Sequence, residues 1–244
     1  MNAVASASDV WVYLSRSPLL GLTLTLAVYV GAQALARRLK FHPLANPVLM
    51  AVTGVVICLV LTGTPYPVYF EGAQFVHFLL GPATVALAIP LYAQLPRIKA
   101  LIVPISGALL VGALTAAVSA VLIARGLGAS EAVQASLLPK SVTAPIAMSI
   151  AEKTGGLPSL TAVLVILTGI LGATLAPAVY RLARLDGAGS QAAQGFALGL
   201  TSHGIGTARA LQLHETTGAF AALAMGMNGA FSALVLPLVA HLLL

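Results

Sequence analysis

The sequence predicts an all-α membrane protein that crosses the bilayer several times. It is 59% hydrophobic and only 7% charged, and its mean hydropathy is +1.00. A soluble domain carries about 25% charged residues, so this chain has too few charges to cover a water-facing surface. We expect one membrane domain over residues 18–244, preceded by a short N-terminal segment, residues 1–17.

Eight apolar stretches each approach the length of ~20 residues that a helix needs to span hydrocarbon. Short loops containing Gly, Pro or charged residues separate them, and one of these loops is predicted at Pro96 and Arg97. We therefore expect seven or eight membrane segments, at residues 19–36, 46–62, 72–94, 98–124, 132–152, 158–183, 192–212 and 217–243.

The first stretch, Leu19–Val30, precedes Ala34–Ala36, which loosely resembles a signal-peptide cleavage site. The segment before it lacks the basic run of a signal peptide, whereas Arg37, Arg38 and Lys40 follow it directly. Because basic residues favour the cytoplasmic side, we expect an uncleaved helix whose C-terminal end faces the cytoplasm.

The net charge of +6 comes from basic residues that sit at segment ends, which is typical of membrane orientation rather than nucleic-acid binding. Eight full spans would place residues 37–40 and Arg181 on opposite sides, although both favour the cytoplasm. Either the arginines at the end of the sixth segment snorkel on the outer side, or one broken segment is re-entrant, which means that it enters and leaves the membrane on the same side. Cys58 is the only cysteine, which excludes an intrachain disulfide.

Three stretches carry helix-breaking or polar residues at their centres and are predicted to be discontinuous helices. Free backbone groups are tolerated in hydrocarbon only when they are buried in protein or line a cavity. The half-helix after each break presents N–H groups that attract anions, with Thr84, Thr143 or Thr207 as a candidate N-cap. The breaks lie at residues 81–84, 138–145 and 201–209.

The three broken segments also resemble an internal repeat, since each is followed by a long helix rich in small residues. Transporters commonly place the broken helices of related repeats around a site at the membrane midplane. Chance similarity among Ala-, Leu- and Gly-rich helices is the alternative.

Lys140 and Arg209 lie at two of these breaks, and charges inside membrane segments usually mark function. The alternative is snorkelling, or a structural ion pair with Glu152 or Glu215. On the functional interpretation, hydroxyls, glycines and an amide join the two cations around a substrate carboxylate. The predicted substrate-binding residues are Lys140, Ser141, Thr143, Ser202, His203, Gly204, Gly206, Thr207, Arg209, Thr84 and Asn228.

Three residues of the last two segments have competing interpretations. His203 is suited to carry a proton in a coupled transporter, and a structural, hydrogen-bonded histidine is equally compatible with the sequence. Asn228 is either a polar contact in the site or a link between helices. Gly195 and Gly199 form a GxxxG motif, which indicates close helix contact.

The chain lacks a Walker A loop and the HExxH and GxSxG motifs, so we expect no enzyme activity. Its histidines and acids do not cluster with ligand spacing, so we expect neither a cofactor nor a bound metal.

Two long motifs resemble the LrgB/CidB family. The first runs from Leu138 to Ala147, followed by Gly155-Gly156 and a helix to Pro177, and the second runs from Gly199 to Ala210. The resemblance covers nearly the whole chain from about residue 20. It implies a multi-pass protein of the bacterial cytoplasmic (inner) membrane.

Members of this family are named holin-like or antiholin-like and are associated with murein hydrolase export and autolysis. The resemblance implies a smaller LrgA/CidA-type membrane partner. Assembly of this chain into a homo-oligomer is a further alternative. A plastid relative carries glycolate and glycerate, and other bacterial relatives are linked to pyruvate.

We therefore predict a transporter of small carboxylates such as glycolate, pyruvate or lactate, with alternating access at the broken helices. The alternative function is antiholin-like modulation of murein hydrolase export and autolysis together with the small partner. The expected partners are thus a small carboxylate, the lipid bilayer and the LrgA/CidA-type protein, and no nucleic acid is expected.

Overall fold

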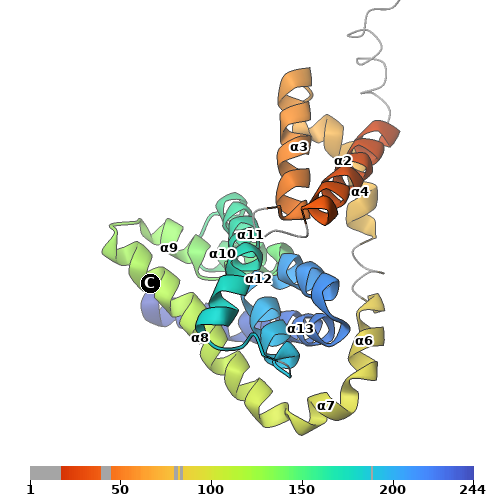
Figure 1. Ribbon diagram of the computed structural model, residues 1–244. Coiled ribbons are helices and arrows are strands. Elements are labelled where there is room, and N and C mark those ends of the chain that lie inside the picture. The colour runs from red at the N-terminus through yellow and green to blue at the C-terminus, as the bar shows by residue number, and fades with distance from the viewer. Residues whose placement is uncertain (1–17, 40–44, 80–81, 83–84, 188) are drawn as a thin grey trace, which may run out of the picture. The chain divides into compact units, whose positions relative to one another are not determined.

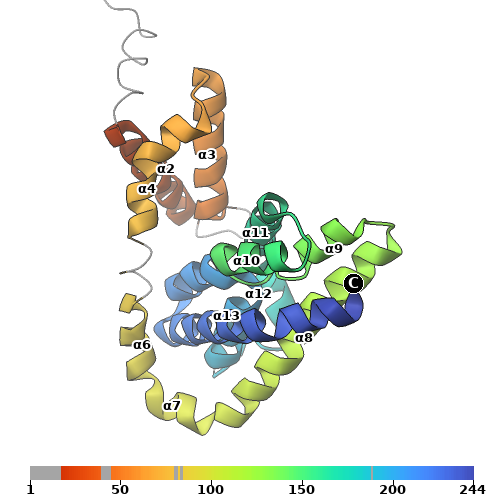
Figure 2. The same ribbon diagram turned by 180° about the vertical axis from the view of Figure 1, so that it is seen from behind.

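The computed structural model describes residues 18–39, 45–79, 82, 85–187 and 189–244 (Figure 1). Among these residues every regular element is a helix, which confirms the all-α prediction. The chain divides into two compact units, Met1–Ala86 and Leu87–Leu244, and each is described by itself. The helices of the second unit are seen from behind in Figure 2.

The first unit contains α2 (Pro18–Arg38), α3 (Pro47–Thr62) and α4 (Tyr66–Phe78), and α2 packs against the other two. The Asn46 side chain accepts hydrogen bonds from the N–H groups at the start of α3, and Gly63 ends this helix in the left-handed region at φ 63°. A Cβ at Gly21 would lie 2.3 Å from the Tyr69 carbonyl oxygen, so α2 and α4 approach closely there.

The second unit holds the remaining helices. They are α6 (Ala88–Ala93), α7 (Leu95–Ala100), α8 (Ile102–Gly126), α9 (Glu131–Leu137), α10 (Ala144–Lys153), α11 (Pro158–Leu182), α12 (Gln191–Leu213) and α13 (Glu215–Leu243). Helices α12 and α13 pack along one another, α11 lies against α12, and α8 crosses both α12 and α13.

Two predicted boundaries of the third and fourth segments are wrong. The helix predicted from residue 72 begins at Tyr66, because the prolines at its start fit the first turn of a helix. Pro96 and Arg97 are helical, since they lie in the first turn of α7, and the chain turns just before them at Gln94 and again at Leu101. The predicted break at residues 81–84 falls between α4 and α6 but lies largely outside the described residues, as does Thr84.

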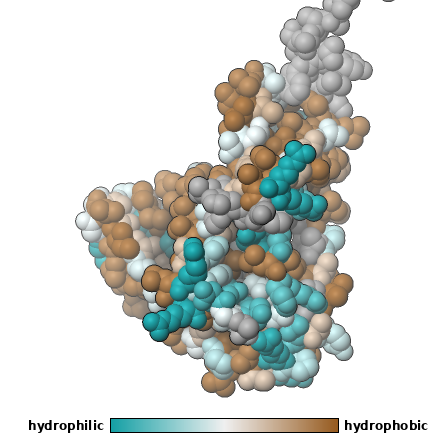
Figure 3. Space-filling view, viewed as in Figure 1, coloured by the Kyte–Doolittle hydropathy of each residue, from teal (hydrophilic) through white to brown (hydrophobic). Residues whose placement is uncertain are grey.

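Four described helices are long and apolar enough to cross a membrane: Leu19–Arg38, Ile102–Gly126, Pro158–Leu182 and Glu215–Leu243. Helix α3 is apolar but shorter. On α8 and α11, large apolar side chains point outward, including Val103, Val111, Leu167 and Leu171. In water this exposure would be unfavourable, whereas lipid tails accommodate it, so the chain is a multi-pass membrane protein. Figure 3 shows the hydrophobic residues over much of the second unit's surface.

Close contact between α12 and α13 depends on the predicted GxxxG pair. A Cβ at Gly195 would lie 2.2 Å from the Thr217 carbonyl oxygen, and one at Gly199 would lie 2.0 Å from that of Ala221. Backbone cannot yield as a flexible side chain can, so both positions require glycine. The structure confirms the predicted role of this motif.

Replacing Gly199 by Ala should therefore force α12 away from α13. We expect the midpoint of thermal unfolding in detergent to fall by roughly 5 °C, because overpacking costs about 1–3 kcal/mol. The matched control is Gly226→Ala on α13, where an added Cβ meets nothing within 4 Å. Equal midpoints for the two variants would contradict this packing.

Candidate functional site

The chain between α9 and α10, residues 138–143, leaves the helical conformation inside the second unit, as the sequence predicts. Pro139 has no N–H to donate, so helical bonding fails at this position. Short turns replace the helical bonds: the Lys140 N–H donates to the Leu137 carbonyl at 3.1 Å, and the Val142 N–H donates to that of Pro139 at 3.0 Å. The break is thus an ordered, buried turn.

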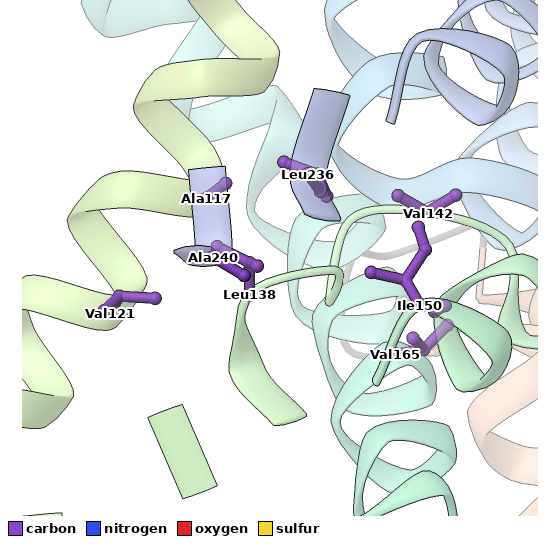
Figure 4. Packing of buried hydrophobic residues seen from close by; sticks show 9 residues of the cluster. Ala117, Val121, Leu138, Val142, Ile150, Val165, Leu236 and Ala240 are labelled. Carbon is purple, nitrogen blue, oxygen red and sulfur yellow. The ribbon is translucent and has the colours of Figure 1, made fainter. Parts of the chain in front are cut away.

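Apolar side chains anchor this break on both sides (Figure 4). Leu138 is 1% exposed and lies beside Ala240 of α13, while Val142, 2% exposed, packs near Ile150 and Val165. Burial of the flanking residues fixes the position of the polar residues between them. Lys140 and Ser141 are therefore held at the centre of the unit's helices rather than on a loose loop.

Lys140 directs its ammonium toward α8. Its Nζ donates to the Ala116 carbonyl oxygen and to the Ser141 hydroxyl, each at 3.3 Å. Neither of these two partners is Glu152, with which the sequence alternatively predicted an ion pair of Lys140. Both present partners are neutral, so the positive charge at the break is hydrogen-bonded but is not neutralised by them.

The second break lies within α12 at His203, whose φ of 42° and ψ of −130° are not helical. A non-glycine residue in this region costs about 1–3 kcal/mol and persists only where its surroundings enforce it. Two glycines of α11 make room for the turn. A Cβ at Gly169 would lie 2.8 Å from the His203 ring, and one at Gly172 would lie 1.9 Å from the Ser202 hydroxyl.

The His203 ring is buried and bonded to the facing helix. Its Nε2 lies 2.9 Å from the Val165 carbonyl oxygen, which can only accept, so Nε2 carries the proton in this arrangement. Any proton relay through His203 would have to use Nδ1. Thr207 does not cap the second half of α12, because its hydroxyl donates to the His203 carbonyl at 2.8 Å from within the helix.

Asn228 of α13 connects the two breaks. Its Nδ2 donates to the Ser141 carbonyl at 3.1 Å and to the Leu200 carbonyl at 3.0 Å, and its Oδ1 accepts from the Ser232 hydroxyl at 3.0 Å. Asn228 is 3% exposed. The structure therefore supports the interhelical interpretation of this residue, and it brings Ser141 and the start of the α12 break to one place.

Most of the predicted site residues belong to this crossing, the two breaks that Asn228 connects. Ser202 and Thr207 are buried beside the His203 turn, Gly204 and Gly206 continue it, and Thr143 occupies the N-cap position of α10 without a side-chain cap bond. Arg209 lines a cavity between α11, both ends of α12 and the start of α13, and this lining contains none of the other predicted residues.

A second cavity, of about 700 Å³, reaches the crossing from another side. It lies between α7, α8 and the first half of α12, and its lining includes Leu200 and Thr201, which precede Ser202 directly. The remaining lining is mostly apolar, with Arg97 at one edge. Arg97 lies 5.9 Å from the centre of the Phe220 ring, a cation–π distance.

Sequence reasoning missed the groups that hold the site together. The carbonyl oxygens of Ala116 and Val165 are backbone atoms, to which no residue-type signal points. Gly169 and Gly172 carry a signal, a GxxG spacing on α11 that faces the second break. Among the described residues, no group of three His, Cys, Asp or Glu is placed to hold a metal ion.

Chemically, the crossing offers one cation, several hydroxyls and the beginnings of two helical segments. Such a set suits a small anion, because the Lys140 ammonium supplies charge and helix N-termini supply N–H donors. Within the part of the crossing that the structure describes, there is no pair of carboxylates.

Comparison with known proteins places the chain in a family. A model of the LrgB-like family matches residues 25–242, across both units. The chain is 39% identical over 207 residues to Uncharacterized protein YwbG of Bacillus subtilis (strain 168), covering 85% of this chain and 90% of that protein. It is 36% identical to Uncharacterized protein YxaC of the same strain, covering 91% and 94%.

A third relative, Holin-like protein CidB of Staphylococcus aureus (strain N315), is 31% identical over 219 residues, which cover 90% of this chain and 94% of that protein. No solved structure gives a significant match. The family match spans nearly the whole chain and includes both interrupted helices. The chain therefore belongs to the LrgB-like family.

Proposed function

We propose that the chain is a holin-like protein of the bacterial cytoplasmic membrane that modulates murein hydrolase export and autolysis together with a smaller LrgA/CidA-type membrane protein. The observation that carries this proposal is the similarity to Holin-like protein CidB over 90% of the chain. The four long apolar helices support a site of action within the bilayer.

Co-expression with an LrgA/CidA-type protein tests this function. We expect the tagged chain to co-purify the small protein in mild detergent, and we expect its deletion to change the rate of detergent-induced autolysis severalfold. Gly199→Ala is the informative variant, because displacing α13 should weaken both effects, whereas Gly226→Ala should preserve them. Unchanged autolysis after deletion, with no co-purification, would contradict the proposal.

A second candidate function is transport of small carboxylates such as glycolate, pyruvate or lactate. The specific observation that favours it is the crossing of two interrupted helices beside Lys140, since a nonspecific pore needs neither. In this proposal the carboxylate binds Lys140 and lowers the cost of moving the site through the barrier. The site comprises Lys140, Ser141, Thr143, Ser202, His203 and Thr207, with Arg209 acting outside it.

Uptake of labelled pyruvate into proteoliposomes tests transport. We expect saturable uptake that falls about tenfold or more in Lys140→Ala, because a charged hydrogen bond contributes about 1.5–3 kcal/mol. The matched control is Lys153→Ala, which removes the same charge from an exposed position at the end of α10. Equal loss in the two variants, or nonsaturable leakage unaffected by Lys140→Ala, would exclude this mechanism.

We further propose that the chain crosses the membrane seven or eight times and that one interrupted segment is re-entrant. Support comes from α3, which is apolar over 16 residues, and from the pair α9 and α10, which are too short to span separately. Arg37 and Arg38, in the last turn of α2, orient that helix with its C-terminal end in the cytoplasm.

A further inference from the structure

A cavity of about 650 Å³ lies where the ends of α11, α12 and α13 meet. Of the residues predicted from the sequence, its lining includes only Arg209. Its volume is in the range of small-molecule sites. Its polar and charged lining consists of Tyr180, Arg181, Asp186, Gln191, Gln194, Arg209, His214 and Thr217.

The charges of this lining are unbalanced. The lining contains two arginines, Arg181 and Arg209, and one acid, Asp186. The Nδ1 of His214 accepts the Thr216 N–H at 3.1 Å, which makes Nε2 the protonated nitrogen of the neutral ring and therefore a donor. Arginine forks are suited to oxyanions, which they bind through two parallel hydrogen bonds.

Hydrogen bonds around the α11–α12 connection make the cavity a built site. The Tyr180 hydroxyl donates to the Gln194 carbonyl at 2.8 Å, and the Gln194 side chain donates to the Leu185 carbonyl at 2.5 Å. These contacts fix the end of α11 against the first turns of α12. Arg181 donates from Nε to the Pro177 carbonyl at 3.3 Å, a contact that uses one of the five N–H groups of its guanidinium.

The cavity lies near the end of a membrane-spanning helix, where ligands from the membrane–water interface can reach it. Arg181 lies in the last turn of the membrane-spanning helix α11, where basic residues mark the membrane–water interface. Figure 3 shows hydrophilic residues gathered on the part of the second unit where Figure 1 draws the end of α11 and the beginning of α12. Basic pockets between membrane helices at this depth suit phosphate groups, either of lipid headgroups or free in solution.

We propose that this cavity binds a phosphate group through Arg181 and Arg209. The proposal is independent of the holin-like function and of transport at Lys140, because it involves neither the crossing nor the partner. The two possible sources, a phospholipid headgroup and soluble phosphate, share this chemistry and are separated by experiment.

Two measurements on the purified full chain test the site. Inorganic phosphate is titrated while the thermal unfolding midpoint is followed at constant ionic strength, and phosphatidylglycerol retained from mixed micelles is counted by native mass spectrometry. Arg181→Gln and Arg209→Gln should abolish whichever signal the wild type shows. Arg184→Gln is the matched control, since this exposed arginine is close in sequence but does not line the cavity.

A phosphate-dependent rise in midpoint that both variants lose would assign a soluble ligand. Retained phosphatidylglycerol that both variants lose would assign a lipid headgroup. If Arg209→Gln fails to fold, Arg181→Gln decides alone, because this side chain is exposed and its replacement disturbs little packing. No binding of either probe, or equal binding in Arg181→Gln and Arg184→Gln, would overturn the proposal.

Discussion

The side-chain amide of Asn228 donates hydrogen bonds to backbone carbonyl groups that the membrane cannot satisfy. Two helices are interrupted there, and an interruption deprives backbone carbonyl groups of their helical partners. In hydrocarbon an unsatisfied polar group costs several kcal/mol. Asn228 donates to one carbonyl from each interrupted helix, those of Ser141 and Leu200, so a single residue stabilises both breaks and fixes their relative position.

Everything polar near the centre of this unit depends on that crossing. Lys140 points to α8 and His203 to α11 because their backbones are held in conformations that no continuous helix allows. The glycines of α11 and α12 have the same purpose, since each gives a neighbouring helix or ring the space that a Cβ would occupy. Arg209 lines the cavity that also includes Arg181, and the lining of that cavity does not include Lys140.

Local chemistry made the breaks predictable. Pro139 cannot continue a helix, and the run from Thr201 to Arg209 combines polar residues with two glycines, so both interruptions follow from sequence. The GxxxG contact of Gly195 and Gly199 was equally readable, because small residues allow helices to approach.

Contacts between residues far apart in the sequence could not be predicted in the same way. The sequence placed Lys140 and Arg209 in one site because both adjoin breaks. Arg209 lies almost two helical turns beyond His203 and lines the cavity that includes Arg181, whose lining does not contain Lys140. Backbone acceptors such as the Val165 carbonyl are identical in every residue and give no signal. Boundaries at Tyr66 and Leu101 were missed because proline is as compatible with a helix start as with a loop.

Hydrogen–deuterium exchange of Asn228→Leu measures the central claim most directly, with Gly226→Ala on the same helix as control. If one amide holds both breaks, amides in residues 138–143 and 200–206 should exchange faster together in Asn228→Leu, while α2–α4 keep wild-type rates. Unchanged exchange in both segments, or a change in only one of them, would contradict the account.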